Sequence, residues 1–143
     1  MASQTGGCLC GSVRYELAEA PTSYGACHCN MCRKFSGGIE LGIQVMADGI
    51  KFEPTETLAS YTSSDWAERG FCISCGSSVF WRLTAEGEMQ GMFSIAAGSL
   101  DDMAGMSFDA EVYVDHKPDS HAFAGERQRM TEAEVLAIFG GDQ

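Results

Sequence analysis

Alternating apolar and polar residues predict several short strands in this chain. All odd-numbered positions of residues 13–17 and 39–45 are apolar, whereas the positions between them are polar or glycine. A period of two residues is typical of strands with one buried face. Residues 78–83, 91–97 and 111–115 contain β-branched and aromatic side chains and predict further strands.

The pattern also predicts where neighbouring strands are joined. Asp48-Gly49 separates the apolar alternation of residues 39–45 from residues 50–52. Because this dipeptide accepts the positive φ of a tight turn, we expect a β-hairpin there. Residues 85–88 are polar and contain a glycine, and they are expected to connect the strands at 78–83 and 91–97.

One helix is predicted, close to the C-terminus. Thr131 and Glu134 have the spacing of a capping box, and Gly140 suits the position after the last turn. The helix is therefore expected to span residues 132–139. Val135, Leu136 and Phe139 fall on one side of it, which indicates a packing face rather than a partner-binding surface. Together these elements predict a mainly β fold with a short C-terminal helix.

Composition and charge exclude some classes of function for this chain. The 143 residues are 45% hydrophobic and 20% charged, which is typical of a globular chain and long enough for one domain, spanning residues 1–143. The net charge of −11 opposes binding to nucleic acids and to anionic membranes. The first seven residues lack the basic and apolar parts of an export signal, and no apolar run approaches 18 residues, so we expect a cytoplasmic protein.

Seven cysteines fall into three short groups, and none stands alone. An odd number rules out complete pairing into disulfides within one chain, which favours metal binding or catalysis. Cys8 and Cys10 project to the same side of an extended backbone, and Cys72 and Cys75 have the spacing of a zinc knuckle, with Gly76 allowing a tight turn. These four thiolates would complete a closed, structural zinc site.

The remaining cysteines are Cys27, Cys29 and Cys32. Three ligands leave one position of a tetrahedron open, which is typical of a catalytic zinc ion. Three alternatives stay open: a redox or storage site, an empty site, or a fourth ligand from His116 or His121. Iron–sulfur ligation is disfavoured because the usual cysteine spacings of such clusters are absent.

Three cysteine-bearing segments carry a family resemblance: GCLCGSVRY at 7–15, CHCNMCRKFSG at 27–37 and FCISCGS at 71–77. They resemble the glutathione-dependent formaldehyde-activating enzyme family, the Gfa/CENP-V domain. The resemblance covers about residues 6–117 and implies a β-tent-like fold with two zinc ions. By motif, it implies that Cys8, Cys10, Cys72 and Cys75 hold a structural zinc ion, and that Cys27, Cys29 and Cys32 hold a catalytic one.

The resemblance implies a carbon–sulfur lyase that adds the thiol of glutathione to formaldehyde and gives S-hydroxymethylglutathione. An acidic protein needs local positive charge to admit an anionic tripeptide, and Arg33, Lys34 and Lys117 are candidates for this role, although each could equally be a solvated surface charge. His28 lies between two cysteines and should point away from the metal. Trp66 and Trp81 are expected in the core or in a pocket wall.

Two other function classes compete with the lyase. The first is a non-catalytic zinc module that binds a thiol or a protein partner, and it requires a side chain in the fourth position at the three-cysteine group. The second is redox sensing by Cys27, Cys29 and Cys32, with release of zinc on oxidation. The physiological aldehyde and thiol and the oligomeric state are left open at this point.

Overall fold

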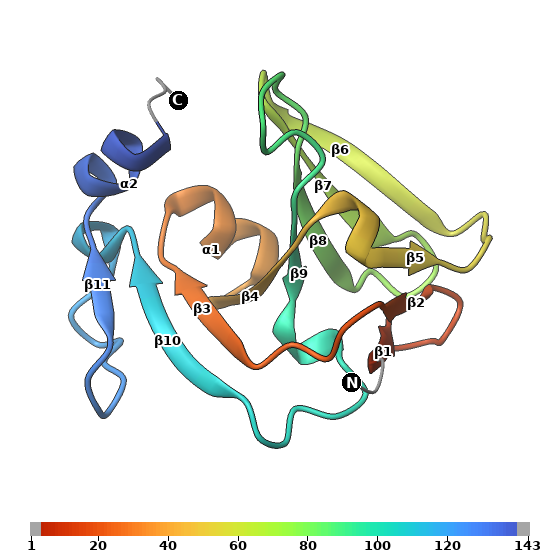
Figure 1. Ribbon diagram of the computed structural model, residues 1–143, viewed down its shortest axis with the longest axis horizontal. Helices are drawn as coiled ribbons and strands as arrows, with labels where there is room; N and C mark the ends of the chain where they lie inside the picture. The colour runs from red at the N-terminus through yellow and green to blue at the C-terminus, as the bar shows by residue number, and fades with distance from the viewer. Residues whose placement is uncertain (1–3, 140–143) are drawn as a thin grey trace.

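The computed structural model describes residues 4–139 and is organised around two β-sheets (Figure 1). The small sheet has the order β1–β2–β5, and the large sheet has the order β11–β10–β3–β4–β9–β8–β7–β6. Neighbouring strands of the large sheet are antiparallel, except that β10 runs parallel to both β3 and β11. The prediction of a mainly β fold with a short C-terminal helix is therefore confirmed.

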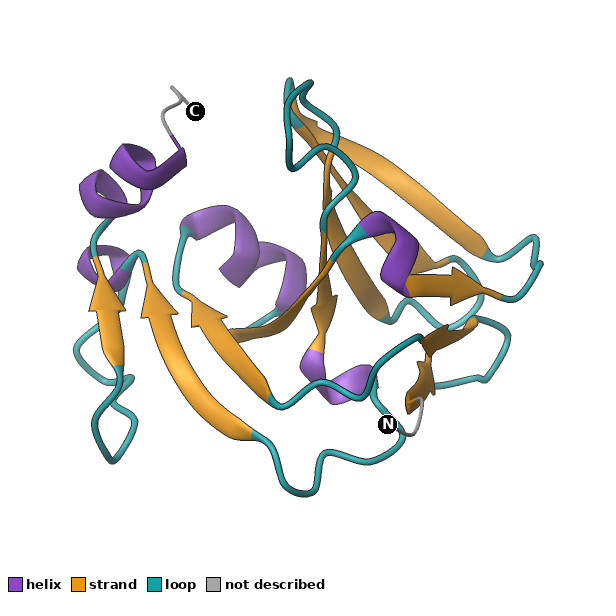
Figure 2. Ribbon diagram, in the orientation of Figure 1, coloured by secondary structure: helices purple, strands orange, loops and turns teal. Residues whose placement is uncertain are grey.

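The elements have the following bounds (Figure 2). The strands of the small sheet are β1 (Gln4–Gly7), β2 (Arg14–Leu17) and β5 (Ile50–Phe52). The strands of the large sheet are β3 (Ser23–Cys27), β4 (Glu40–Val45), β6 (Leu58–Ser64), β7 (Ala67–Cys72), β8 (Ser78–Leu83), β9 (Phe93–Ala96), β10 (Ser107–Val112) and β11 (Gln128–Met130). The helices are α1 (Asn30–Ser36) and α2 (Glu132–Phe139), and the short 3₁₀ turns are η1 (Ala47–Gly49), η2 (Ala97–Ser99) and η3 (Val114–His116).

Aromatic side chains join the two sheets. Tyr15 and Phe52 of the small sheet are in edge contact, with ring centroids 5.8 Å apart. Phe52 in turn packs against Phe80 and Phe93 of the large sheet at 5.7 and 5.9 Å. The alternation predicted for residues 13–17 places Tyr15 in this core, where it is almost fully buried.

The predicted hairpin at Asp48-Gly49 is wrong. Strand β4 pairs with β3 and β9 in the large sheet, whereas β5 pairs with β2 in the small sheet. Asp48 and Gly49 lie in the 3₁₀ turn η1, in which the Gly49 N–H donates to the Met46 carbonyl at 2.8 Å. The dipeptide therefore carries the chain from one sheet to the other, where Phe52 reaches the aromatic core.

The other predicted strands match to different degrees. Strand β8 has the predicted bounds, and β9 stops at Ala96 because the backbone turns into η2. The strand predicted at 111–115 starts earlier and ends at Val112, since Tyr113 adopts a left-handed conformation (φ 58°) and caps the N-terminus of η3. The polar connection predicted at 85–88 is confirmed.

Helix α2 has the predicted bounds and the predicted capping box. The Thr131 N–H donates to Glu134 Oε1 at 2.9 Å, and the Glu134 N–H donates to Thr131 Oγ1 at 3.3 Å. Val135 is buried, whereas Gly140 and the side chain of Phe139 lie outside the described residues. Within residues 4–139, no helix combines the length and the hydropathy that a membrane crossing requires.

Helix α1 was not predicted. Cys29 caps its N-terminus by accepting a hydrogen bond from the Cys32 N–H at 3.3 Å, and Gly37 ends it in a left-handed conformation (φ 80°). Its first turn has no acidic residue, and a cysteine stands where a cap is usually Ser, Thr, Asp or Asn. The large sheet curves around this helix (Figure 1), and Ser78 Oγ of β8 donates to the Phe35 carbonyl at 2.9 Å.

The two faces of the large sheet have different roles. Across β7, β8 and β9, one face carries Gly70, Phe80 and Ile95, which belong to or pack against the core. The other face carries Arg69, Trp81 and Ser94 in the adjacent register. Because side chains alternate along each strand, the apolar core is excluded from this second face, which remains available for a functional site.

We predict that Gly70→Ala destabilises the protein. A β-carbon at position 70 would overlap the ring of Phe80, so the core would be overpacked at a cost of about 1–3 kcal/mol in the free energy of unfolding. Urea unfolding measures the loss. Gly38→Ala is the matched control, because a β-carbon there meets no atom within 4 Å, and it should change the stability by less than about 0.5 kcal/mol. Equal effects of both changes would contradict the packing argument.

Candidate metal centres and the adjoining cavity

Four cysteines from two distant segments converge at one end of the sheets. Cys8 and Cys10 follow β1, Cys72 ends β7, and Cys75 lies in the next turn. Their sulfur atoms all lie within 4.8 Å of one another, with 3.6 Å between Cys8 and Cys10 and 3.8 Å between Cys10 and Cys72. A zinc ion with four sulfur ligands at ~2.3 Å requires sulfur–sulfur separations of ~3.8 Å. This quartet therefore fits a closed tetrahedral metal site.

Tight turns and serine hydroxyls shape the quartet. Gly11 and Gly76 both have φ near 80°, and the Gly76 N–H donates to the Cys72 carbonyl at 2.8 Å. Hydrogen bonds from Ser12 and from backbone amides lower the pKa of Cys72 to about 5. Hydrogen bonds from Ser77 lower the pKa of Cys75 to about 7 in the same way. Both thiols are thereby prepared to bind a cation as thiolates.

The other three cysteines form a second cluster, the trio. Cys27 ends β3, Cys29 caps α1, and Cys32 lies buried in the first turn of that helix. Their sulfur atoms also lie within 4.8 Å of one another. Hydrogen bonds from Cys27 and Cys32 lower the pKa of Cys29 to about 2, whereas hydrogen bonding within the trio, followed by burial and the neighbouring negative charge, raises the pKa values of Cys27 and Cys32. The trio therefore stabilises one thiolate readily, and further ionisation requires a cation.

No histidine joins the trio within the part of the chain that the structure describes. The group of ligand atoms within 4.8 Å of one another contains only the three sulfurs. His116, a candidate fourth ligand, instead contacts Glu132 at 2.9 Å and belongs to a separate group with Asp115. His121, the other candidate, belongs to none of the ligand groups formed by residues 4–139.

A buried ion pair lies beside the trio. Arg69 Nη2 donates to Cys32 Sγ at 3.5 Å, and Arg69 Nη1 lies 3.5 Å from Glu40 Oε2. Burial raises the pKa of Glu40. Glu40 is the neighbour of Cys27 across β3 and β4, and Arg69 is the neighbour of Trp81 across β7 and β8, so sheet pairing positions both residues. Glu40 and Arg69 were not predicted from the sequence, because polar positions of alternating strands are normally expected to face solvent.

A cavity of about 650 Å³ opens beside the trio. Cys27, Cys29 and Cys32 are part of its wall, together with Arg69 and Tyr113. Among residues 4–139, Tyr113 is the only residue other than glycine with positive φ, a conformation that is costly for a bulky side chain. Burial raises the pKa of its hydroxyl to about 12, so this group remains a neutral hydrogen-bond donor near pH 7.

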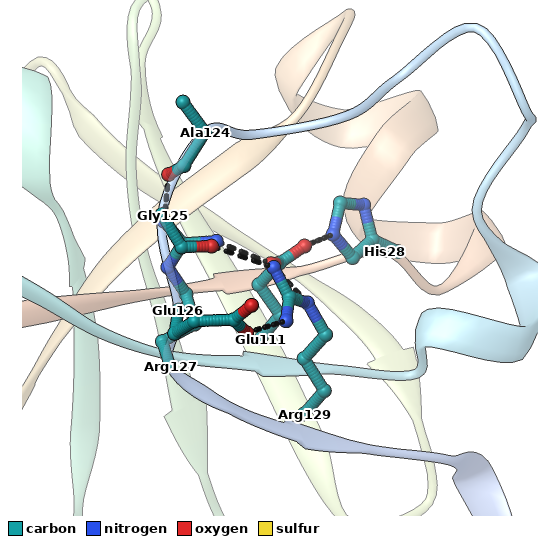
Figure 3. Close-up of polar contacts among 7 residues, drawn as sticks. All are labelled: His28, Glu111, Ala124, Gly125, Glu126, Arg127 and Arg129. Atoms are coloured by element: carbon teal, nitrogen blue, oxygen red, sulfur yellow. Dashed lines mark hydrogen bonds and ion pairs between the residues drawn. The ribbon is translucent and has the colours of Figure 1, made fainter.

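His28 faces away from the trio, as the alternation around it predicted. Its Nε2 lies 2.8 Å from Glu111 Oε1, and both side chains are 2% exposed (Figure 3). The second Glu111 oxygen accepts hydrogen bonds from Arg127 at 2.8 Å and from Arg129 at 3.1 Å. Although burial favours the neutral acid, hydrogen bonds from His28 and Arg127 hold the pKa of Glu111 below its usual range. This network anchors the loop that carries Cys27 and Cys29.

The structure does not bring the predicted basic residues to the cavity wall. Arg33 and Lys34 are exposed on α1, directly after Cys32, and Lys117 is half-buried after η3. None of the three lines the cavity. Trp66 and Trp81 do line it, so their assignment to a pocket wall is confirmed.

Comparison with known proteins decides the family. The model of the family described as glutathione-dependent formaldehyde-activating enzyme matches residues 3–116, a segment that contains all seven cysteines. The chain belongs to this family. The resemblance inferred from the three cysteine-bearing segments is thereby confirmed.

Two relatives show how much of the chain the similarity covers. An uncharacterised lyase of Schizosaccharomyces pombe is 29% identical over 140 residues, which cover 95% of this chain and 96% of the relative. A protein of Halomonas elongata named "Putative glutathione-dependent formaldehyde-activating enzyme" is 30% identical over 83 residues, which cover 52% of this chain and 53% of that protein. The alignment thus spans only about half the length of the second relative.

We predict that Glu111→Gln lowers the free energy of unfolding by about 3–5 kcal/mol at pH 7, because it removes the charge that His28, Arg127 and Arg129 share. Urea unfolding provides the measurement. Glu126→Gln is the matched control, since Glu126 also contacts Arg129 but is 94% exposed, and it should change the stability by less than about 1 kcal/mol.

The same variant should change the dependence of stability on pH. The pKa of Glu111 is lower in the folded state than its usual value of 4.5, so its contribution is complete above that pH and is lost as the pH falls through the folded-state pKa. Below pH 4.5, the stability of Glu111→Gln should therefore fall less steeply than that of the wild type. Parallel curves would show that Glu111 is not held as an anion.

Proposed function

We propose that this protein is a zinc-dependent carbon–sulfur lyase that adds the thiol of glutathione to formaldehyde or a related aldehyde. The observation that carries the proposal is that the three sulfurs of the trio line a cavity and no fourth protein ligand belongs to their group among residues 4–139. In the reaction a bond forms between the thiol sulfur and the carbonyl carbon, and the thiol proton ends on the former carbonyl oxygen. The reverse reaction breaks that carbon–sulfur bond.

The donor set of the trio suits zinc, because soft thiolates are preferred ligands of this ion. A zinc ion held by Cys27, Cys29 and Cys32 supplies Lewis acidity and lowers the pKa of a thiol bound beside it. The guanidinium of Arg69 compensates the negative charge of the thiolates, since it contacts Cys32. The hydroxyl of Tyr113 offers a hydrogen bond to the oxygen atom on which negative charge develops in the cavity.

The anionic tripeptide is proposed to lie along α1. Met31 and Cys32 line the cavity, and the next two residues of the same helix are the exposed Arg33 and Lys34. A thiol that reaches the trio from this side would bring its carboxylates to those cations, with Lys117 as a further candidate contact. We place the reaction in the cytoplasm, because a reducing compartment keeps the seven cysteine thiols unpaired.

The quartet is proposed to hold a second, structural zinc ion. Its ligands tie the turn after β1 to the turn after β7, so one ion would join the small sheet to the large sheet. Four sulfur ligands leave no position for substrate, and the role of this site would be to stabilise the fold.

NMR exchange between formaldehyde and glutathione tests the lyase. We expect micromolar wild-type protein to accelerate the exchange well above the spontaneous rate, and Cys29→Ser to lose at least about 99% of that acceleration. The same spectra recorded without protein supply the rate to subtract. Absence of acceleration by zinc-loaded wild-type protein would reject the lyase in favour of the non-catalytic zinc module.

The two clusters should respond differently to loss of one thiol. We expect Cys72→Ser to lose most of the folding stability, because a closed site contributes folding free energy, whereas Cys29→Ser remains folded. Thermal unfolding followed by circular dichroism measures the stability, and metal analysis should give two zinc ions per wild-type chain. Similar melting losses in both variants would contradict the division into a structural and a catalytic site.

A further inference from the structure

The cavity identifies the kind of aldehyde that the site accepts. Resting on the proposed function, we infer that the substrate is an uncharged aldehyde whose carbonyl carries an apolar chain or ring of several carbon atoms. The trio and Tyr113 would receive the carbonyl end, and the apolar substituent would lie against Trp66 and Trp81.

The cavity is far larger than formaldehyde requires. Its volume of about 650 Å³ falls in the range of sites that bind whole small-molecule ligands. One water molecule has a share of ~30 Å³ in the liquid, and formaldehyde contains only one more non-hydrogen atom than water. The cavity therefore has room both for the thiol end of glutathione and for an aldehyde larger than formaldehyde.

Large apolar side chains form part of the cavity wall. Trp66 and Trp81 meet edge to face, with ring centroids 5.5 Å apart and planes at 70°. Met89 and Met92, from the loop before β9, line the same cavity as Leu83 of β8. An aromatic pair beside flexible methionines favours an apolar group and has little to offer a polar tripeptide backbone.

Sheet pairing makes the apolar wall continuous with the trio. Arg69, which contacts Cys32, is the direct neighbour of Trp81 across β7 and β8. Trp81 is in turn the neighbour of Ser94 across β8 and β9. Adjacent strands lie only ~4.8 Å apart, so a chain of a few carbon atoms is long enough to pass from the carbonyl end of the cavity to the tryptophans.

Charge on the wall selects against anionic aldehydes. The side chains that line the cavity include four carboxylates, from Glu40, Glu86, Glu88 and Asp109. Among residues 4–139, Arg69 supplies the only cationic side chain of this wall, and it already contacts both Glu40 and Cys32. An aldehyde with a carboxylate would therefore meet net negative charge without a free partner, whereas an uncharged one would not.

Three aldehydes of different size and charge test the inference with glutathione as the thiol: hexanal, formaldehyde and glyoxylate. The quantity compared is kcat/KM divided by the spontaneous second-order rate constant for the same aldehyde, which removes differences in intrinsic reactivity. We expect this acceleration to be at least about tenfold greater for hexanal than for formaldehyde or glyoxylate, since each methylene held in an apolar pocket contributes to discrimination.

Two variants locate the preference in the wall. Trp81→Leu and Trp66→Leu should each lower the ratio of hexanal to formaldehyde acceleration by about tenfold, and thermal unfolding reports whether each variant is folded. Tyr61→Leu is the matched control, because Tyr61 neighbours Arg69 across β6 and β7 but is 66% exposed and outside the cavity wall. It should leave the ratio unchanged.

The outcomes separate this inference from the proposed function. If the reaction of formaldehyde or glyoxylate with glutathione is accelerated as much as that of hexanal, or more, the inference is wrong and the proposed lyase function is unaffected. A hexanal preference that survives in both folded tryptophan variants would also overturn it. Failure of the wild type to accelerate any of the three aldehydes would overturn the lyase itself, and the inference with it.

Discussion

Crowding of sulfur atoms is the constraint on which the rest of the structure depends. Separations of 3.6 and 3.8 Å within the quartet bring its thiols into contact. Two unit charges about 4 Å apart repel each other by about 4 kcal/mol near a protein surface, so the fully ionised clusters require positive charge between or beside them. In the quartet, serine hydroxyls and turn amides stabilise the thiolates of Cys72 and Cys75. In the trio, the guanidinium of Arg69 donates a hydrogen bond to Cys32 and supplies the positive charge. Binding of a cation is thereby coupled to proton release and to the fold itself.

Local sequence patterns were sufficient to predict those parts of the structure that depend on residues close together in the chain. Cysteine spacing divided the seven thiols into the quartet and the trio that the folded chain brings together. Alternation identified β2 and β4, β-branched and aromatic residues identified β8, and a capping box identified α2. These successes have a common cause, because each signal lies within a few residues of the feature that it predicts.

Long-range pairing explains what the pattern did not reveal. Asp48-Gly49 has the local chemistry of a hairpin, but burial of Phe52 with Tyr15 places β5 in the other sheet. Glu40 and Arg69 occupy polar positions that alternation assigns to solvent, yet the curved sheet buries both beside the trio. Alternation of apolar and polar residues shows which side chains of a strand share a face, but it does not show what packs against each face.

The ion-pair network at Glu111 has a consequence for the order in which the molecule forms. His28 and Glu111 are separated by 83 positions, and the remaining partners, Arg127 and Arg129, come later still in the chain. Contacts of such long range are slow to close, because much of the chain must be organised first. During synthesis, the trio therefore leaves the ribosome well before the groups that anchor its loop. The surroundings of the trio are therefore incomplete until the segment that contains Arg127 and Arg129 has been synthesised.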